Sequence, residues 1–113
     1  MSGPFSFRRG LAASLLALAA TGAHAMDCGP YKAVALQAQS GDLLIALSTP
    51  AGVIWKELGG WSLPSTKPFQ ALAQQALASQ VSVLLRYPDP YTGGCTVTDY
   101  GTVPVVLRLD TTQ

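Results

Sequence analysis

The residues whose types and spacing best suit contact with a ligand are Tyr87, Asp89 and Tyr91, which stand close together in the stretch "YPDPYTGGC". Two aromatic rings can stack on the C–H face of a sugar, and a carboxylate accepts hydrogen bonds from its hydroxyl groups. Trp61, in a long stretch before a predicted helix, can join them. The sequence therefore offers these four side chains as a candidate ligand-binding set.

The same stretch has a purely structural interpretation. Pro88 and Pro90 favour a tight turn, and Tyr87 can complete a strand as a core residue. The two glycines that follow let the chain bend, so that Cys95 can reach Cys28. Both interpretations, the structural turn and the ligand loop, stay open at the level of sequence.

The predicted mature chain, residues 26–113, contains no histidine. The single histidine, His24, lies in a predicted leader segment. Without it, there is no imidazole for a serine or cysteine nucleophile system and no histidine ligand for zinc or copper. The acidic residues are scattered, which does not suit a calcium loop. We therefore expect a protein that is not an enzyme, with no catalytic residues, no metal and no cofactor.

The first 25 residues have the pattern of a secretory signal peptide. Arg8 and Arg9 supply the positive charge, and the apolar run 11–20 is too short to span a bilayer as a helix. The small-x-small pattern 23–25 then predicts cleavage after Ala25. The sequence predicts export to the periplasm or beyond the cell, and leaves a single small domain over residues 26–113 without a membrane span.

The charge balance of the predicted mature chain excludes one class of partner. Of the seven lysines and arginines, Arg8 and Arg9 fall in the leader, so five basic residues face six acidic ones. Such a chain has no basic field that would attract phosphates. We expect no nucleic-acid partner, and the remaining candidates are a glycan, a protein partner or further copies of the chain.

Two cysteines, Cys28 and Cys95, remain in residues 26–113. An exported chain meets an oxidising compartment, so an intramolecular disulfide between them is the first expectation. The alternative is a bridge between subunits. A redox pair does not fit, because the two cysteines are not separated by two residues.

Hydrophobic periodicity predicts strands and one helix. Residues at 69, 72, 73, 76 and 77 form one apolar helical face, with Ser65 or Thr66 as a possible cap and Pro68 in the first turn. Alternating or short apolar runs bounded by turns predict the strands. These strands cover residues 32–39, 43–48, 53–58, 81–87 and 103–109.

The resulting order, β-β-β-α-β-β, is that of a small five-stranded OB-fold-like barrel. In that fold a helix closes one end, and ligands meet one face and its loops. The fold class predicted from the sequence is therefore mainly β with one helix, closed into a barrel.

Three stretches also resemble a known family. They are "VIW" in the third predicted strand, "FQALAQQALAS" in the helix and "VSVLLRYPDPY" after it. This pattern resembles the secreted B subunits of subtilase-cytotoxin type and related small exported bacterial OB-fold proteins without assigned activity. The resemblance implies an OB fold, a ring-forming habit and a sugar-binding role.

Two functions from different classes follow. The first is an exported binding module that recognises a glycan or another envelope component. The alternative is a structural or accessory protein that acts through oligomerisation or a protein partner. The helix supports this alternative, because its outer face carries glutamine and alanine instead of charged side chains.

Overall fold

The structure is a computed structural model that describes residues 25–111. It confirms a mainly β protein with one helix, in the predicted order. The elements are β1 (Met26–Ala38), β2 (Asp42–Thr49), β3 (Gly52–Gly60), α2 (Thr66–Ser79), β4 (Ser82–Tyr87) and β5 (Val106–Asp110). The predicted signal peptide (residues 1–25) and His24 fall almost wholly outside the described residues, so the leader stays a prediction.

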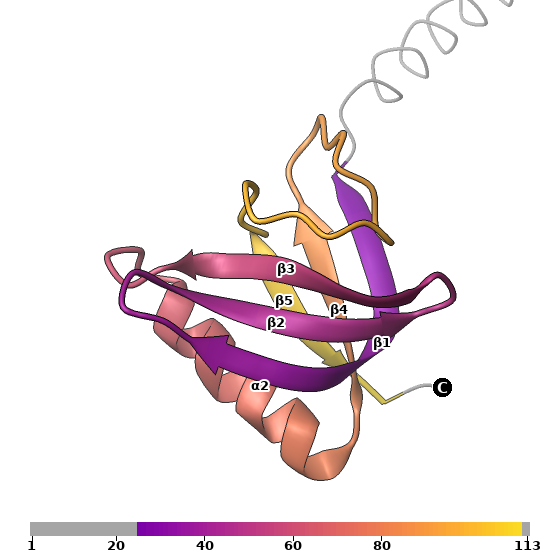
Figure 1. The fold of residues 1–113 in the computed structure, drawn as a ribbon, viewed down its shortest axis with the longest axis horizontal. Helices are drawn as coiled ribbons and strands as arrows, with labels where there is room; N and C mark the ends of the chain where they lie inside the picture. The colour runs from indigo at the N-terminus through magenta and orange to yellow at the C-terminus, as the bar shows by residue number, and fades with distance from the viewer. Residues whose placement is uncertain (1–24, 112–113) are drawn as a thin grey trace, which may run out of the picture.

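The five strands form one antiparallel sheet in the order β3-β2-β1-β4-β5. The long strand β1 connects the two halves: residues 26–32 pair with β4, and residues 32–38 pair with β2. A bulge between Ala33 and Ala35 lies just beyond the switch from one partner to the other. A bulge bends its strand and increases the local twist. In Figure 1, β4 and β5 accordingly run across the direction of β2 and β3.

The prediction of a closed barrel is wrong for this structure, because β3 and β5 do not pair. The outer edge of β3 instead meets the connection between β4 and β5 at one parallel bridge, Lys56 to Asp99. The amide of Asp99 donates to the carbonyl of Trp55 (3.0 Å), and the amide of Glu57 donates to the carbonyl of Asp99 (3.2 Å). β5 begins only at Val106, so this bridge belongs to the connection and not to the last strand.

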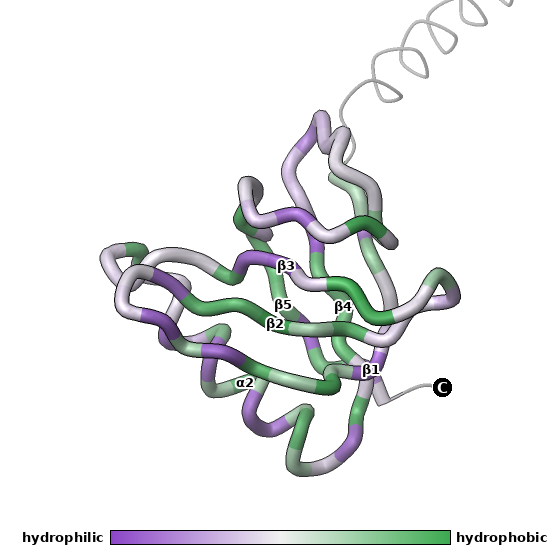
Figure 2. Tube along the Cα trace, viewed as in Figure 1, coloured by the Kyte–Doolittle hydropathy of each residue, from purple (hydrophilic) through white to green (hydrophobic). Residues whose placement is uncertain are grey.

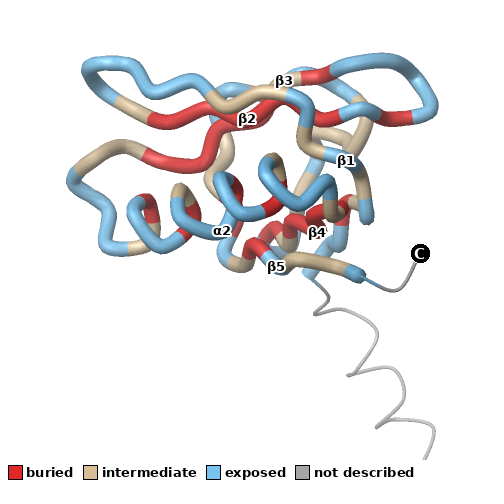
Figure 3. Tube along the Cα trace, turned by 90° about the horizontal axis from the view of Figure 1, so that it is seen from below, coloured by how far each residue is buried: buried red, intermediate tan, exposed pale blue. Residues whose placement is uncertain are grey.

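The core lies between the curved sheet and α2, as Figure 3 shows from below. Phe69, Ala73 and Ala76 are the apolar residues of the helix that are buried, whereas Leu72 is 37% exposed. Neither residue proposed as the cap caps the helix with its side chain: Ser65 makes no such bond, and the Thr66 hydroxyl donates to the carbonyl of Gly60 (2.6 Å). The helix therefore packs through a narrower apolar stripe than its sequence predicts.

Strand β2 is buried on both faces, which explains its continuous apolar run (Figure 2). Leu43, Ile45 and Leu47 belong to the core cluster. Leu44 and Ala46 alternate with them and are also buried, at 7% and 1% exposed. The second face of β2 is thus covered as well, and Leu44 lies at the base of the hollow described below.

No helix among residues 25–111 is long and apolar enough to cross a membrane.

Candidate functional site

Tyr87 and Tyr91, predicted as ligand platforms, stack on each other. Their ring centroids are 4.1 Å apart and their planes differ by 10°. Tyr87 is fully buried at the end of β4, and Tyr91 is half-buried. Asp89 is exposed in the turn between them. The two rings therefore meet face to face, and Tyr87 presents no exposed ring surface.

Trp61 lies apart from these tyrosines, at the opposite end of β1. Its Nε1 donates to the carbonyl of Gln39 (2.7 Å), immediately after β1 ends. Tyr87 instead pairs with Met26, where β1 begins. Because β1 is 13 residues long and a strand rises about 3.3 Å per residue, Trp61 does not share a surface hollow with the tyrosine loop.

The disulfide between Cys28 and Cys95 is confirmed, with an S–S distance of 2.06 Å. Cys28 lies in β1 and is 1% exposed. Cys95 belongs to the connection between β4 and β5. The bond therefore fixes this connection to the middle of the sheet.

Lys56 anchors the same connection from the other side, and its side chain is fully buried. Its Nζ donates to the hydroxyl of Tyr91 (2.8 Å) and to the carbonyl of Gly94 (2.6 Å). The Tyr91 hydroxyl in turn donates to Oδ2 of Asp99 (2.9 Å). Burial lowers the pKa of Lys56 and raises the pKa of Tyr91. We call Lys56, Tyr91, Gly94 and Asp99 the lysine anchor.

The lysine anchor has no room for a ligand. A Cβ atom at Gly93 would lie 2.6 Å from both the Tyr91 hydroxyl and Oδ2 of Asp99. The hydroxyl of Tyr87 is buried without a hydrogen-bond partner. The stretch "YPDPYTGGC" is therefore packed against the sheet, and the Tyr91 hydroxyl is bonded to Lys56 and Asp99 instead of facing a ligand.

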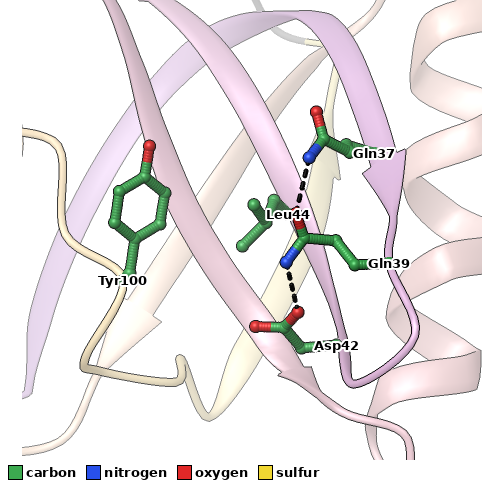
Figure 4. Close-up of a pocket in the computed structure, with 5 residues that line it drawn as sticks. All are labelled: Gln37, Gln39, Asp42, Leu44 and Tyr100. Carbon is green, nitrogen blue, oxygen red and sulfur yellow. Dashed lines mark hydrogen bonds between the residues drawn. The ribbon is translucent and has the colours of Figure 1, made fainter.

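A different part of the molecule carries an open hollow of about 310 Å³, on the side of the sheet opposite the core (Figure 4). Leu44 is at its base, and the exposed ring of Tyr100 stands across from the two glutamines. Its lining consists of three polar side chains, one leucine and one tyrosine: Gln37, Gln39, Asp42, Leu44 and Tyr100.

The polar lining of the hollow is internally ordered. Nε2 of Gln37 donates to Oε1 of Gln39 (2.6 Å), and Nε2 of Gln39 donates to Oδ1 of Asp42 (2.8 Å). The amide of Gln39 also donates to the carbonyl of Asp42 (2.8 Å), which closes the hairpin between β1 and β2. A tight hairpin thus holds the amide groups and the carboxylate in one row.

Strand register brings this row beside Glu57. Gln37 pairs with Leu44 across β1 and β2, and Leu44 pairs with Glu57 across β2 and β3. Glu57 is 6% exposed and accepts a hydrogen bond from the amide of Gly59 (3.1 Å). Burial, with Asp42 nearby, raises the pKa of Glu57 to about 7. The hydrogen bond from Gln39 lowers the pKa of Asp42.

Sequence reasoning missed the hollow and Glu57, although some signals were present. Gln37 and Gln39 have the i, i+2 spacing that places side chains on one face of a strand. Gln39 and Asp42 bracket a turn. Glu57 is an acid inside an apolar strand pattern. Nothing local could associate Tyr100 with them, because its place depends on the bridge between Asp99 and β3.

No group of three or more histidine, cysteine, aspartate or glutamate side chains suited to a metal ion occurs within residues 25–111. No protein-family model, curated protein or solved structure matches this chain.

Proposed function

We propose that this protein is an exported, non-catalytic binding module that holds a neutral glycan, or another hydroxyl-rich envelope component, in the hollow lined by Gln37, Asp42 and Tyr100. The observation that carries the proposal is the composition of this hollow. It joins an exposed aromatic ring, an apolar base, two amide groups and a carboxylate.

This combination suits a sugar. Amide groups both donate and accept hydrogen bonds, and a carboxylate accepts them, so hydroxyl groups of either orientation find a partner. The face of Tyr100 offers a surface for the C–H side of a ring. Binding sites in general combine an apolar surface with a few well-placed polar groups.

The arrangement of strands supports the same proposal. We propose that the fold is an open form of the OB barrel, because the order β3-β2-β1-β4-β5 would close if β3 met β5. The parallel bridge from Lys56 to Asp99 lies where that closure would begin. OB folds bind ligands on the face of their second and third strands, beside the β1–β2 and β4–β5 loops. The hollow is lined by residues of β1, the β1–β2 turn, β2 and the β4–β5 connection, which is what this proposal expects.

A binding role fits the two acidic groups better than catalysis. Glycosidases place a pair of carboxyl groups about 5 to 9.5 Å apart, on either side of the bond that they cleave. Here Asp42 borders the hollow, whereas Glu57 is buried and accepts the amide of Gly59. The hollow therefore offers a ligand one carboxylate, and this kind of catalysis needs two.

Export from the cell would bring the protein to glycans and other envelope components, which favours them as the ligand class. A disulfide is expected in an oxidising compartment, and a signal peptide is predicted from residues 1–25. A sugar-binding role is also what the resemblance to B subunits of subtilase-cytotoxin type implies.

The test is a fluorescence titration of Trp61, whose indole bonds to the carbonyl of Gln39 beside the hollow. A Trp55→Phe background removes the second tryptophan. The protein is titrated with a panel of neutral and acidic oligosaccharides. We expect saturable binding of a neutral sugar, and we expect Tyr100→Ala to weaken it at least tenfold.

Asp89→Ala is the matched control, because Asp89 is an exposed residue of the loop that the sequence offered as a candidate site. Its affinity should stay within about twofold of the parent. Loss of binding in Asp89→Ala with full binding in Tyr100→Ala would move the site to that loop. A folded protein that binds no member of the panel would reject the proposal.

A second candidate, an accessory protein that associates through α2, is favoured by the outer face of the helix. Leu72 is 37% exposed there, beside the exposed Gln74, Gln75 and Ala78. Native mass spectrometry of the folded protein tests this candidate. A change from oligomer to monomer in Leu72→Glu would support it, and a strict monomer at all concentrations would remove it.

A further inference from the structure

We propose that Asp42 sets the charge preference of the hollow: a sugar that carries a protonated amino group binds better than its neutral counterpart, and a sugar that carries a carboxylate binds worse. This inference rests on the proposed function, because it concerns the ligand of the same hollow. It is carried by the fixed position of Asp42, by the direction of the hydrogen bonds beside it and by the places of the basic side chains.

Asp42 is held through both its main chain and its side chain. Its carbonyl accepts the amide of Gln39 (2.8 Å), and its Oδ1 accepts Nε2 of the same residue (2.8 Å). As the first residue of β2, Asp42 also pairs with Gly60 in β3. A ligand therefore cannot displace this carboxylate from the lining of the hollow without breaking the bonds of the hairpin.

The hydrogen bonds of the polar row run toward the carboxylate. Nε2 of Gln37 donates to Oε1 of Gln39 (2.6 Å), and Nε2 of Gln39 donates to Oδ1 of Asp42. One amide hydrogen of each glutamine is thus used within the row, which ends in a group that only accepts. A hydroxyl or ammonium group can donate to that end, whereas a ligand carboxylate would place further acceptors against it.

The basic side chains are engaged away from the hollow. Lys56 is buried in the lysine anchor, and Lys32 donates to the carbonyl of Gln80 at the end of α2 (2.9 Å). None of the basic residues within residues 25–111 lines the hollow, so the charge of Asp42 is not balanced there. The other three are Lys67 on α2, Arg86, which pairs with Asp27, and Arg108, which pairs with Asp110.

The hollow is small enough for one charge to act throughout it. A compact space of about 310 Å³ is about 8 Å across, which is similar to the Debye length of about 8 Å at physiological ionic strength. Leu44 at the base offers no opposite charge, and Glu57, its partner in β3, is either neutral or negative. A charged group of the ligand therefore interacts with Asp42 wherever it lies in the hollow.

The ring of Tyr100 favours the same sign of charge. It is 57% exposed and stands across from the two glutamines (Figure 4). The face of an aromatic ring is negative and attracts an ammonium group. A protonated amino sugar therefore gains from Asp42 and from Tyr100, whereas a carboxylate gains from neither.

The experiment compares forms of one sugar that differ only at C6. The neutral probes are β-1,4-linked trisaccharides of glucose, galactose and mannose. Each is compared with its 6-amino-6-deoxy form and with its C6 carboxylate by calorimetry of the wild-type protein at neutral pH. For a trisaccharide that binds, we expect the amino form to bind about threefold more tightly and the carboxylate form about tenfold more weakly than the neutral form.

Two matched variants locate the source of the preference. Asp42→Asn keeps the shape of the side chain and an oxygen for Nε2 of Gln39, but it removes the charge. In this variant the penalty on the carboxylate form should shrink to less than about threefold, and the advantage of the amino form should disappear. Asp89→Asn removes the same charge from an exposed residue of another loop, and it should leave both ratios within about twofold of the wild-type values.

Salt gives a measurement that does not depend on the folding of a variant. Raising the ionic strength from about 0.01 M to about 1 M shortens the Debye length from about 30 Å to about 3 Å. The affinities of the three forms for the wild-type protein should then converge to within about threefold.

The outcomes separate this inference from the proposed function. Equal affinity of the three forms overturns the charge preference and leaves the binding of neutral sugars standing. An unchanged order in Asp42→Asn, or a spread of affinities that salt does not reduce, assigns the discrimination to shape and also overturns it. If no form of any trisaccharide binds, the charge preference is wrong, and the wider sugar panel followed by Trp61 fluorescence decides the proposed function on its own.

Discussion

Lys56 brings a charged side chain into the interior, where burial alone would cost several kcal/mol. The cost is offset by two hydrogen bonds from Nζ, to Tyr91 and Gly94, and by the nearby negative charge of Asp99. Each partner belongs to the connection between β4 and β5. The lysine therefore stabilises the position of this long irregular segment against β3.

Replacing Lys56 should therefore be costly. Lys56→Met keeps most of the side-chain volume but removes the hydrogen bonds that Nζ donates to the carbonyl of Gly94 and to the Tyr91 hydroxyl. We expect the free energy of unfolding in urea to fall by about 2–4 kcal/mol. Lys67→Met, at an exposed lysine in the first turn of α2, is the control and should change it by less than about 0.5 kcal/mol. Equal effects of the two substitutions would contradict the anchoring role.

Glu57 also makes stability depend on pH. Its pKa in the folded protein is about 7, above the ordinary 4.5. The folded state therefore holds the proton more tightly than the unfolded state does. This contribution to stability is complete below about pH 4.5, and it is lost as the pH rises through 7. The total loss is about 3 kcal/mol at 1.36 kcal/mol per pH unit.

Urea unfolding of the wild-type protein and of Glu57→Gln between pH 5 and pH 8 measures this loss. The wild-type protein should lose most of the 3 kcal/mol across the interval, and the variant should lose less than about 1 kcal/mol. Parallel profiles would show that another group accounts for the pH dependence.

At the scale of elements, the end of α2 shows a conflict between residue type and backbone conformation. Gln80 caps the helix in the left-handed region, with φ of 58°. Glycine occupies this conformation without the steric cost that a Cβ atom brings. We expect Gln80→Gly to raise the free energy of unfolding by about 0.5–1 kcal/mol.

A glycine substitution at Gln74, within the helix, should instead lower the free energy of unfolding. Gln74 lies on the exposed side of the helix interior, where glycine is about 1 kcal/mol less favourable than good helix formers. Thermal unfolding of Gln80→Gly and Gln74→Gly therefore gives a matched comparison. If both substitutions lowered the free energy of unfolding, the left-handed conformation of Gln80 would not be a source of instability.

Residue patterns predicted which elements form but not how far they extend. Strand β1 begins at Met26 instead of Lys32, because Gly29 and Pro30 interrupt the alternation that marks a strand. The structure places this pair at the irregularity between Cys28 and Tyr31 in the pairing with β4. Strand β5 begins at Val106 instead of Val103. In both cases the partner strand, not local propensity, decides where pairing begins.

The candidate site was less predictable than the fold. Aromatic and acidic residues in "YPDPYTGGC" suggested a ligand loop, yet Tyr87 is buried against Tyr91 and Trp61 bonds to another hairpin. A local sequence pattern cannot show whether a ring faces solvent. The hollow combines residues from β1, β2 and the β4–β5 connection, so it follows from strand register and from the bridge at Asp99.

At the scale of the whole molecule, the β4–β5 connection is held at two independent points. The disulfide fixes Cys95 to Cys28 in β1, and the lysine anchor fixes Tyr91 and Asp99 to β3. Tyr100 follows Asp99 directly in the chain. Tyr100, the aromatic residue that lines the hollow, is therefore positioned by the attachment to β3. The disulfide mainly stabilises the domain as a whole.

Removing the disulfide should separate these two roles. The bond joins residues 67 positions apart, and loss of so long a crosslink relaxes the unfolded chain by about 4 kcal/mol in the chain-entropy description. That is a large share of the roughly 5–15 kcal/mol that small domains possess. We expect Cys28→Ala/Cys95→Ala to lose about 4 kcal/mol in urea unfolding, and the wild-type protein under reducing conditions to lose a similar amount.

Below its unfolding transition, the same double variant should retain the hollow, because the lysine anchor is intact. Its affinity for the sugar found by titration should stay within about threefold of the wild-type value, whereas Lys56→Met should weaken binding more despite keeping the disulfide. The comparison is made by Trp61 fluorescence at a temperature where both variants are folded. If the double variant lost binding and Lys56→Met kept it, the position of Tyr100 would depend on Cys95, and the bridge between Asp99 and β3 would be secondary.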